Sequence, residues 1–148
     1  MPWNVADERG WSLLSQVGAS RIYRPEAGIV AIVADDKSRH SVALATLQRL
    51  VVREVARWEG QRLGLLLCMD GLVAQDSGAR RTLVEQCTPE LYFALAISCS
   101  SRLGQLIGKY FLGTRKLAIP VGMFDTAPDA LGWLRAQRDS NGGPLQPS

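Results

Sequence analysis

The chain has 148 residues, of which 47% are hydrophobic and 21% are charged, and its formal net charge is +3. This balance favours one globular domain with a buried core, and it argues against low-complexity disorder and a strongly basic nucleic-acid-binding surface. The first residues include early acids and lack a long apolar run, and no later run reaches the roughly 18 apolar residues of a spanning helix. We therefore expect a cytoplasmic protein with no nucleic-acid partner and no integral membrane association.

The residues that usually bind metals or form disulfides are few and scattered. The three cysteines, Cys68, Cys87 and Cys99, lie far apart in apolar surroundings and form no CxxC pair. His40 is the only histidine. This pattern predicts buried free thiols in a reducing compartment, rather than a disulfide framework or a zinc site. No metal, cofactor or catalytic residue is predicted.

The first part of the chain predicts an arm followed by a hairpin. We assign residues 1–18 to an N-terminal arm, in which Trp3 and Trp11 either pack on the domain or form a loose extension. Two strands follow at Ser20–Arg24 and Gly28–Ala34, because β-branched residues flank a turn that contains proline and glycine.

A polar loop at Asp35–His40 precedes a predicted helix over Ser41–Trp58. Apolar residues recur there every three or four positions, and Gly60 is placed to end the helix in a left-handed cap. The predicted buried stripe is Leu44, Leu47, Val51, Val55 and Trp58. The predicted polar side is Gln48, Arg49, Arg53 and Arg57.

The middle of the chain predicts two central strands. Leu63–Met69 and Leu91–Ser98 are continuous apolar runs, which is typical of strands that are buried on both faces. Between them lie a loop at Asp70–Asp76 and a short helix at Ser77–Cys87.

The last third predicts a helix at Ser101–Leu112, a strand at Pro120–Phe124 and a helix at Thr126–Gln137. Thr126, followed three residues later by an acid, is predicted to be the N-cap of the last helix. Residues 139–148 are rich in glycine, proline and serine and are predicted to be a disordered tail.

The order is β-β-α-β-α-β-α-β-α. It predicts an α/β domain over residues 19–138, with a mixed, mostly parallel five-stranded sheet and helices packed on it.

Motifs in the second half carry a family resemblance. Leu63–Met69 precedes a loop and a helix, Ser100–Gly104 precedes Ile119–Val121, and Met123–Asp125 precedes Ala130–Leu134. In this order the chain resembles the STAS domain in its bacterial SpoIIAA-like branch, which also shares a fold resemblance with Sec14 lipid-binding proteins. The resemblance implies a non-enzymatic regulatory or protein-interaction module.

The resemblance also implies a phosphorylation candidate. Related anti-sigma factor antagonists carry an Asp-Ser-Ser-Gly motif, and the matching place here contains Asp76, Ser77 and Gly78 with one serine missing. Ser77 either caps the following helix or accepts a phosphate, which the helix N-terminus and nearby arginines would stabilise. Both readings stay open at this point.

A second candidate binding position follows the strand Leu91–Ser98. Ser100, Ser101 and Arg102 open the next helix, where backbone N–H groups and a guanidinium group can hold an anion or a partner. The plainer alternative is that a serine caps the helix and Arg102 is solvated.

Two functions are compatible with these patterns. The first is a module that binds a protein partner or itself, as a homodimer, under the control of Ser77. The second is a Sec14-like protein that binds an apolar or anionic small molecule or a lipid, or an enzyme with a recruited apolar pocket. In the second case, Ser101–Leu112 and the arm with Trp3 and Trp11 would border the pocket.

Overall fold

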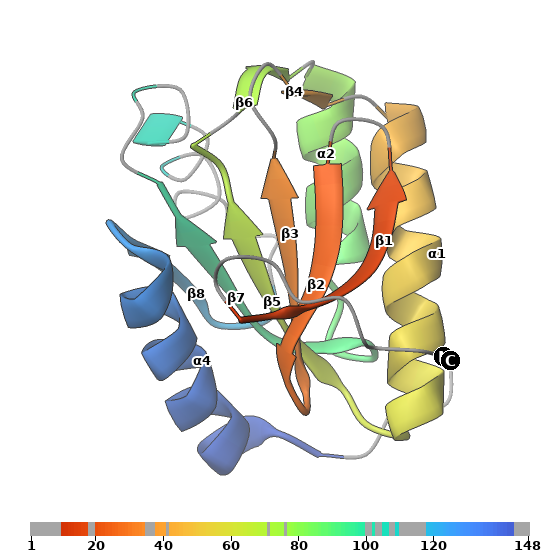
Figure 1. Cartoon of the computed structure of the whole chain (residues 1–148), viewed down its shortest axis with the longest axis vertical. Coiled ribbons are helices and arrows are strands. Elements are labelled where there is room, and N and C mark those ends of the chain that lie inside the picture. The colour runs from red at the N-terminus through yellow and green to blue at the C-terminus, as the bar shows by residue number, and fades with distance from the viewer. Residues whose placement is uncertain are drawn as a thin grey trace.

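A six-stranded sheet with the strand order β1-β2-β3-β5-β7-β8 forms the centre of the protein (Figure 1). The computed structural model describes residues 10–143, apart from residues 18–19, 35–37, 41, 71, 76, 100–101, 103–104, 107–108 and 110–117. The fold is the predicted α/β arrangement with a mixed, mostly parallel sheet, but the predicted number of five strands is wrong.

The antiparallel part of the sheet contains the additional strand. β1 (Ser12–Val17) pairs with β2 (Ser20–Glu26), which pairs with β3 (Ile29–Ala34). The turn between β2 and β3 contains Gly28 at φ +81°, a conformation that glycine adopts without a steric penalty. β1 lies inside the predicted arm at residues 1–18. The sequence pattern of β1 was too weak to predict a strand. In the structure β1 is an edge strand, and its leucines are only half-buried.

The parallel part of the sheet agrees with the prediction. β5 (Leu63–Cys68) and β7 (Tyr92–Ser98) are buried along their whole length and lie between β3 and β8 (Val121–Phe124). All three pairings from β3 to β8 are parallel. The continuous apolar runs therefore identified the two central strands correctly.

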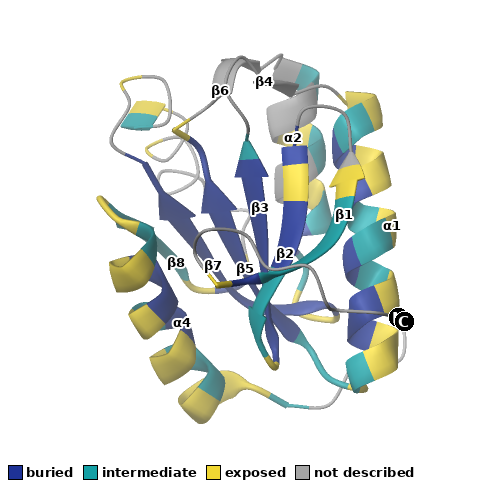
Figure 2. Ribbon diagram, viewed as in Figure 1, coloured by how far each residue is buried: buried dark blue, intermediate teal, exposed yellow. Residues whose placement is uncertain are grey.

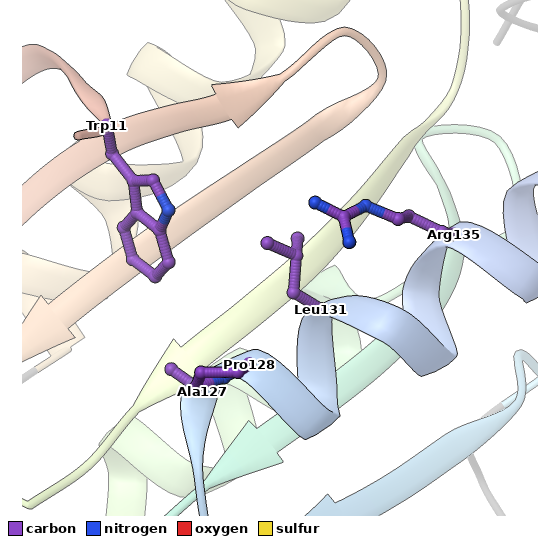
Figure 3. A pocket seen from close by; sticks show the side chains of 5 residues that line it. All are labelled: Trp11, Ala127, Pro128, Leu131 and Arg135. Atoms are coloured by element: carbon purple, nitrogen blue, oxygen red, sulfur yellow. The ribbon is translucent and has the colours of Figure 1, made fainter. Parts of the chain in front are cut away.

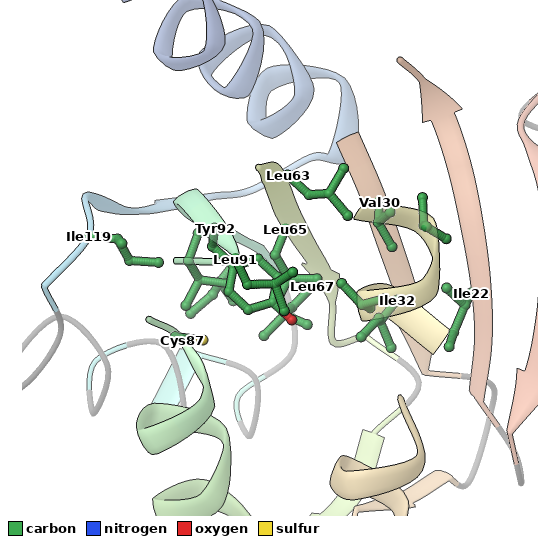
Figure 4. Close-up of a cluster of buried hydrophobic side chains, with 14 of the residues drawn as sticks. Ile22, Val30, Ile32, Leu63, Leu65, Leu67, Cys87, Leu91, Tyr92 and Ile119 are labelled. Atoms are coloured by element: carbon green, nitrogen blue, oxygen red, sulfur yellow. The ribbon is translucent and has the colours of Figure 1, made fainter. Parts of the chain in front are cut away.

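Alternate residues of the strands form two cores on opposite faces of the sheet. α1 (Val42–Glu59) contributes to one core, and α4 (Ala127–Asn141) contributes to the other. Figure 4 shows side chains of the α1 core, including Ile22 and Leu65. α2 (Ser77–Gln86) packs beside α1.

Two predicted loops contain short strands. β4 (Ser38–His40) lies within the loop predicted at Asp35–His40, and β6 (Leu72–Gln75) lies within the loop predicted at Asp70–Asp76. The two strands pair in parallel as a separate two-stranded sheet. Neither strand was predicted: β4 has three polar residues and β6 has four residues, and segments this short form strands only when a partner supplies the hydrogen bonds.

The predicted helix at Ser101–Leu112 is described only in part. Arg102, Gln105, Leu106 and Lys109 are helical, and the other residues of this range lie outside the described residues. Among the described residues, no helix combines the length and the apolar character that crossing a membrane requires.

The predicted buried stripe of α1 is wrong for two of its five members, and Leu44 and Val51 are half-buried. Val55 is fully buried, but Leu47 is 52% exposed and Trp58 is 57% exposed. Gln48, which was assigned to the polar side, is buried. The residues of α1 that are buried are Ala45, Gln48, Val52, Val55 and Ala56. The helix thus carries two apolar stripes, and the stripe with the smaller side chains lies on the sheet.

The last helix begins as predicted and ends later. Thr126 is the N-cap of α4, and its Oγ1 accepts a hydrogen bond of 3.3 Å from the backbone N–H of Asp129. The helix continues to Asn141, and the backbone N–H of Arg62 donates to the carbonyl of Gly143 at 3.0 Å. Residues 139–143 are therefore part of the fold rather than of a tail, and residues 144–148 lie outside the described residues.

Candidate functional site

The carboxyl edge of the parallel sheet brings together the loops that carry the predicted site residues. β5 and β7 end at Cys68 and Ser98, which are register partners, and the backbone N–H of Met69 donates to the carbonyl of Ser98 at 3.0 Å. The chain segments that lead to α2 and to the helix containing Arg102 therefore leave the sheet at the same edge. Ligands commonly bind at this edge in α/β proteins.

The predicted site residues are described only in part at this edge. Ser77 is the first residue of α2, Gly78 is half-buried, and Arg102 is helical and exposed. Asp76, Ser100 and Ser101 lie outside the described residues. The phosphorylation of Ser77 and the binding role of this edge therefore stay predictions.

The thiol at this edge is held in its protonated form. Burial raises the pKa of the Cys99 thiol, and the negative charges of Asp70 and Asp125 raise it further. On the α1 side of the sheet, burial raises the pKa of Cys87 to about 12. A thiol must ionise to act as a nucleophile, so neither cysteine is suited to that role at neutral pH.

Within the described ranges of the chain, histidine, cysteine, aspartate and glutamate side chains do not gather in groups of three or more that could hold a metal ion.

A groove lies on the α4 face of the sheet, between the start of β1 and α4 (Figure 3). Its volume is ≈ 390 Å³, and its lining consists of Trp11, Ala127, Pro128, Leu131 and Arg135. Trp11 is 8% exposed, and its indole ring meets the ring of Tyr23 edge to face, with 6.0 Å between the ring centroids. Trp11 is therefore a fixed wall of the groove.

Two arginines of α4 hold the β2–β3 turn beside this groove. Arg135 Nε lies 2.6 Å from Glu26 Oε1, and Arg138 Nη1 lies 2.7 Å from Glu26 Oε2 and 2.7 Å from the carbonyl of Ala27. Partial burial raises the pKa of Glu26, but the hydrogen bonds and charges of the two arginines outweigh this effect and lower it below its ordinary value.

Sequence patterns did not identify this groove. The only signal for its helical wall is the spacing of Ala127, Leu131 and Arg135, which are four residues apart and share one face of α4. Trp11 was recognised as a residue that could border a pocket, but the strand that positions it was not predicted.

The outer face of α1 is a third candidate surface. Leu50 is 59% exposed, Leu47 is 52% exposed and Val42 is 45% exposed. Figure 2 shows exposed residues along the side of α1 that faces away from the sheet. α1 is tied to the end of α2 by a hydrogen bond from the Arg49 guanidinium to the carbonyl of Gln86.

Comparisons with known proteins agree with the fold. A family model described as Domain of unknown function (DUF7793) matches residues 23–138. The chain is similar to an uncharacterized protein of the DUF3478 family with a SpoIIAA-like fold from Shewanella loihica PV-4. The identity is 16%, the match covers 78% of this chain and 92% of that chain, and the TM-score is 0.55. This similarity confirms the predicted SpoIIAA-like fold.

A second solved structure, apo-SiaC from Pseudomonas aeruginosa, is 14% identical over 76% of this chain and 98% of that chain, with a TM-score of 0.48. No curated protein matches the chain.

Proposed function

We propose that this chain, which belongs to the family described as Domain of unknown function (DUF7793), is a non-enzymatic protein-interaction module that binds a partner through the outer face of α1. The observation that carries the proposal is the exposure of Leu47 and Leu50, at 52% and 59%. The proposed location of the module is the cytoplasm.

The exposed leucines of α1 supply a driving force for binding. Moving a leucine side chain from water into an apolar contact is worth about 1.5–3 kcal/mol when the burial is complete. Leu47 and Leu50 lie one turn apart on the same side of the helix, so one partner surface can cover both. Val42 adds a further exposed apolar side chain at the start of the helix.

Charges beside the leucines favour a partner with an acidic edge. Arg53 and Arg57 lie one and two turns beyond Leu50, with Arg57 exposed and Arg53 half-buried, and they outnumber the exposed acid Glu54 on this part of the helix. Complementary charges at the rim of an apolar patch orient the partner and speed association. We therefore specify the partner as a protein that presents apolar side chains bordered by aspartate or glutamate.

Ser77 is the proposed point of regulation. It begins α2, and the other end of α2 is joined to α1 through Arg49 and Gln86. A phosphate at the N-terminus of α2 would interact favourably with the helix dipole and would alter the charge near the carboxyl edge of the sheet. Asp76, Gly78 and the segment at residues 100–102 are the proposed contacts for a partner kinase or effector at this edge.

The α1 surface is tested with a matched pair of leucine substitutions. The double variant Leu47→Glu/Leu50→Glu is compared with Leu106→Glu, because Leu106 is also 59% exposed but lies on a different helix. Partners are captured from an extract of the source organism with each variant and identified by quantitative mass spectrometry. The best candidate is then purified and its affinity for each variant is measured.

The proposal requires that purified partner binds the wild type and Leu106→Glu with equal affinity and binds the double variant at least about tenfold more weakly. Equal binding to all three variants would remove α1 as the docking surface. If the wild type forms a homodimer and the double variant is a monomer, the partner of the α1 surface is a second copy of this chain and not an acidic protein.

Binding of a small molecule is the second candidate function. The groove between Trp11 and α4 favours it, because it is concave, mostly apolar and within the range of ligand-sized cavities at ≈ 390 Å³.

A further inference from the structure

We infer that the groove between Trp11 and α4 binds a small organic carboxylate with a flat apolar body. The inference rests on the second candidate function and specifies its ligand class. It does not involve the outer face of α1, which belongs to the opposite side of the sheet.

The apolar part of the groove is rigid on both sides. Trp11 is held against Tyr23 by an edge-to-face contact and is almost fully buried, and Leu131 is 7% exposed in the core beneath α4. Ala127 and Pro128, in the first turn of the helix, complete the wall opposite Trp11. Fixed, mostly apolar walls favour a flat ring system, which loses little conformational entropy on binding.

The positive charge of Arg135 favours a negatively charged ligand. It is the only charged residue in the described lining of the groove, and its side chain is 51% exposed. Its contact with Glu26 is made through Nε, so within the described part of the chain its two terminal nitrogens are available to a second acceptor. A guanidinium group pairs best with a planar carboxylate, which accepts two parallel hydrogen bonds.

The contact with Glu26 leaves Arg135 able to bind a second carboxylate. The carboxylate of Glu26 is shared by two arginines, Arg135 and Arg138, so its single negative charge does not neutralise both. Asp139 lies 3.9 Å from Arg138 rather than at the groove, and it is 78% exposed to the screening effect of water. Figure 3 shows the side chain of Arg135 at the groove beside Leu131, and its Nε donates a hydrogen bond of 2.6 Å to Glu26 Oε1.

The size of the groove limits the ligand to one small ring system. A volume of ≈ 390 Å³ lies near the lower end of the range of about 300–1,000 Å³ that ligand pockets occupy. The stripe formed by Ala127, Leu131 and Arg135 runs along α4, so the apolar body is expected near the start of the helix and the carboxylate one to two turns further on.

The test uses 2-naphthoate as the probe and the neutral 2-naphthamide as its matched control, on the full chain labelled with ¹⁵N. Titration with 2-naphthoate is expected to shift the indole N–H signal of Trp11. 2-Naphthamide is expected to bind at least about tenfold more weakly, because it lacks the charge that Arg135 recognises. Equal affinity for the two probes, or no binding of 2-naphthoate at millimolar concentration, would overturn the inference.

Two substitutions separate recognition from a general loss of charge. Arg135→Gln and Arg138→Gln each remove one arginine from Glu26, but only Arg135 lines the groove. Arg135→Gln is expected to abolish the preference for the carboxylate, and Arg138→Gln is expected to keep it. Equal losses in both variants would show that the preference is nonspecific and would contradict the inference.

Two further variants complete the design. Ala127→Leu adds volume at the groove wall and is expected to weaken both probes, with a far-ultraviolet circular dichroism spectrum to verify folding. Leu50→Glu alters the α1 surface and is expected to leave 2-naphthoate binding unchanged. The proposed ligand site in the groove and the proposed partner surface on α1 are therefore tested independently of each other.

Discussion

α1 and α4 cover opposite faces of the same sheet, but they differ on the sides that face away from it. α4 buries Ala130, Leu131 and Leu134 and exposes mostly polar or small residues. α1 buries one apolar stripe and exposes a second that contains Leu47 and Leu50. Packing on the sheet uses only one apolar stripe of each helix, and the second stripe of α1 is the surface that we propose for partner binding.

The two helices are similar in how they hold the β2–β3 turn. Glu59 at the end of α1 accepts a hydrogen bond from Arg24 Nη2 and another from the backbone N–H of Gly28, both at 3.0 Å. Near the end of α4, Arg135 and Arg138 bind Glu26. The hairpin is thus held from both faces of the sheet.

The largest expected effect is a difference in the free energy of unfolding between substitutions of a buried leucine and of an exposed leucine. Leu134→Ala removes a fully buried side chain of α4 and is expected to lower the free energy of unfolding by about 2–5 kcal/mol. Leu50→Ala, on the outer face of α1, is expected to change it by no more than about 0.5 kcal/mol. Urea denaturation measures both. A large loss of stability in Leu50→Ala would mean that the outer stripe serves the fold itself.

Two glycines test the packing between α4 and the sheet. A Cβ at Gly64 would lie 2.8 Å from Phe93 Cζ and 3.2 Å from Leu134 Cδ2, so Gly64→Ala is expected to cost about 1–3 kcal/mol. At Gly132 no atom lies within 4 Å of the added Cβ, so Gly132→Ala is expected to stabilise α4 by about 0.5–1 kcal/mol. Thermal melts of the two variants should shift in opposite directions, and equal shifts would contradict this packing.

The smallest expected effect concerns the contact between Glu26 and α4. Its lowered pKa means that the folded state binds the proton less tightly than the unfolded state, so the contact stabilises the fold above the ordinary pKa of 4.5. This stabilisation is lost as the pH falls below that value. Glu26→Gln is expected to cost about 0.5 kcal/mol at neutral pH.

The measurement for Glu26→Gln is a series of urea denaturation curves from neutral pH to about pH 3. The stability difference between wild type and variant should shrink as the pH falls. A difference that stays constant over this range would show that the charge of Glu26 does not contribute to the docking of α4.

The sequence was sufficient where a local pattern has one structural solution. The apolar runs that became β5 and β7 fit only central strands, and Thr126 followed by Asp129 specified the start of α4. The resemblance to the SpoIIAA-like branch depended on these same core segments, and the similarity to a solved structure confirmed the fold.

The candidate sites were less predictable, because they depend on distant parts of the chain. The groove joins Trp11 to residues of α4 that are more than a hundred positions away, and only the pairing of β1 with β2 places Trp11 there. The predicted residues Asp76, Ser100 and Ser101 lie outside the described residues, so their role is still a prediction.

The sequence by itself determined that Val42–Glu59 is a helix, but it did not determine which side of that helix is buried. Periodicity identifies apolar stripes, and α1 has two. The tertiary structure decided between them: Val52, Val55 and Ala56 are buried in the core that the strands form on this face of the sheet. The larger Leu47 and Leu50 were left on the surface, where they are available to a partner.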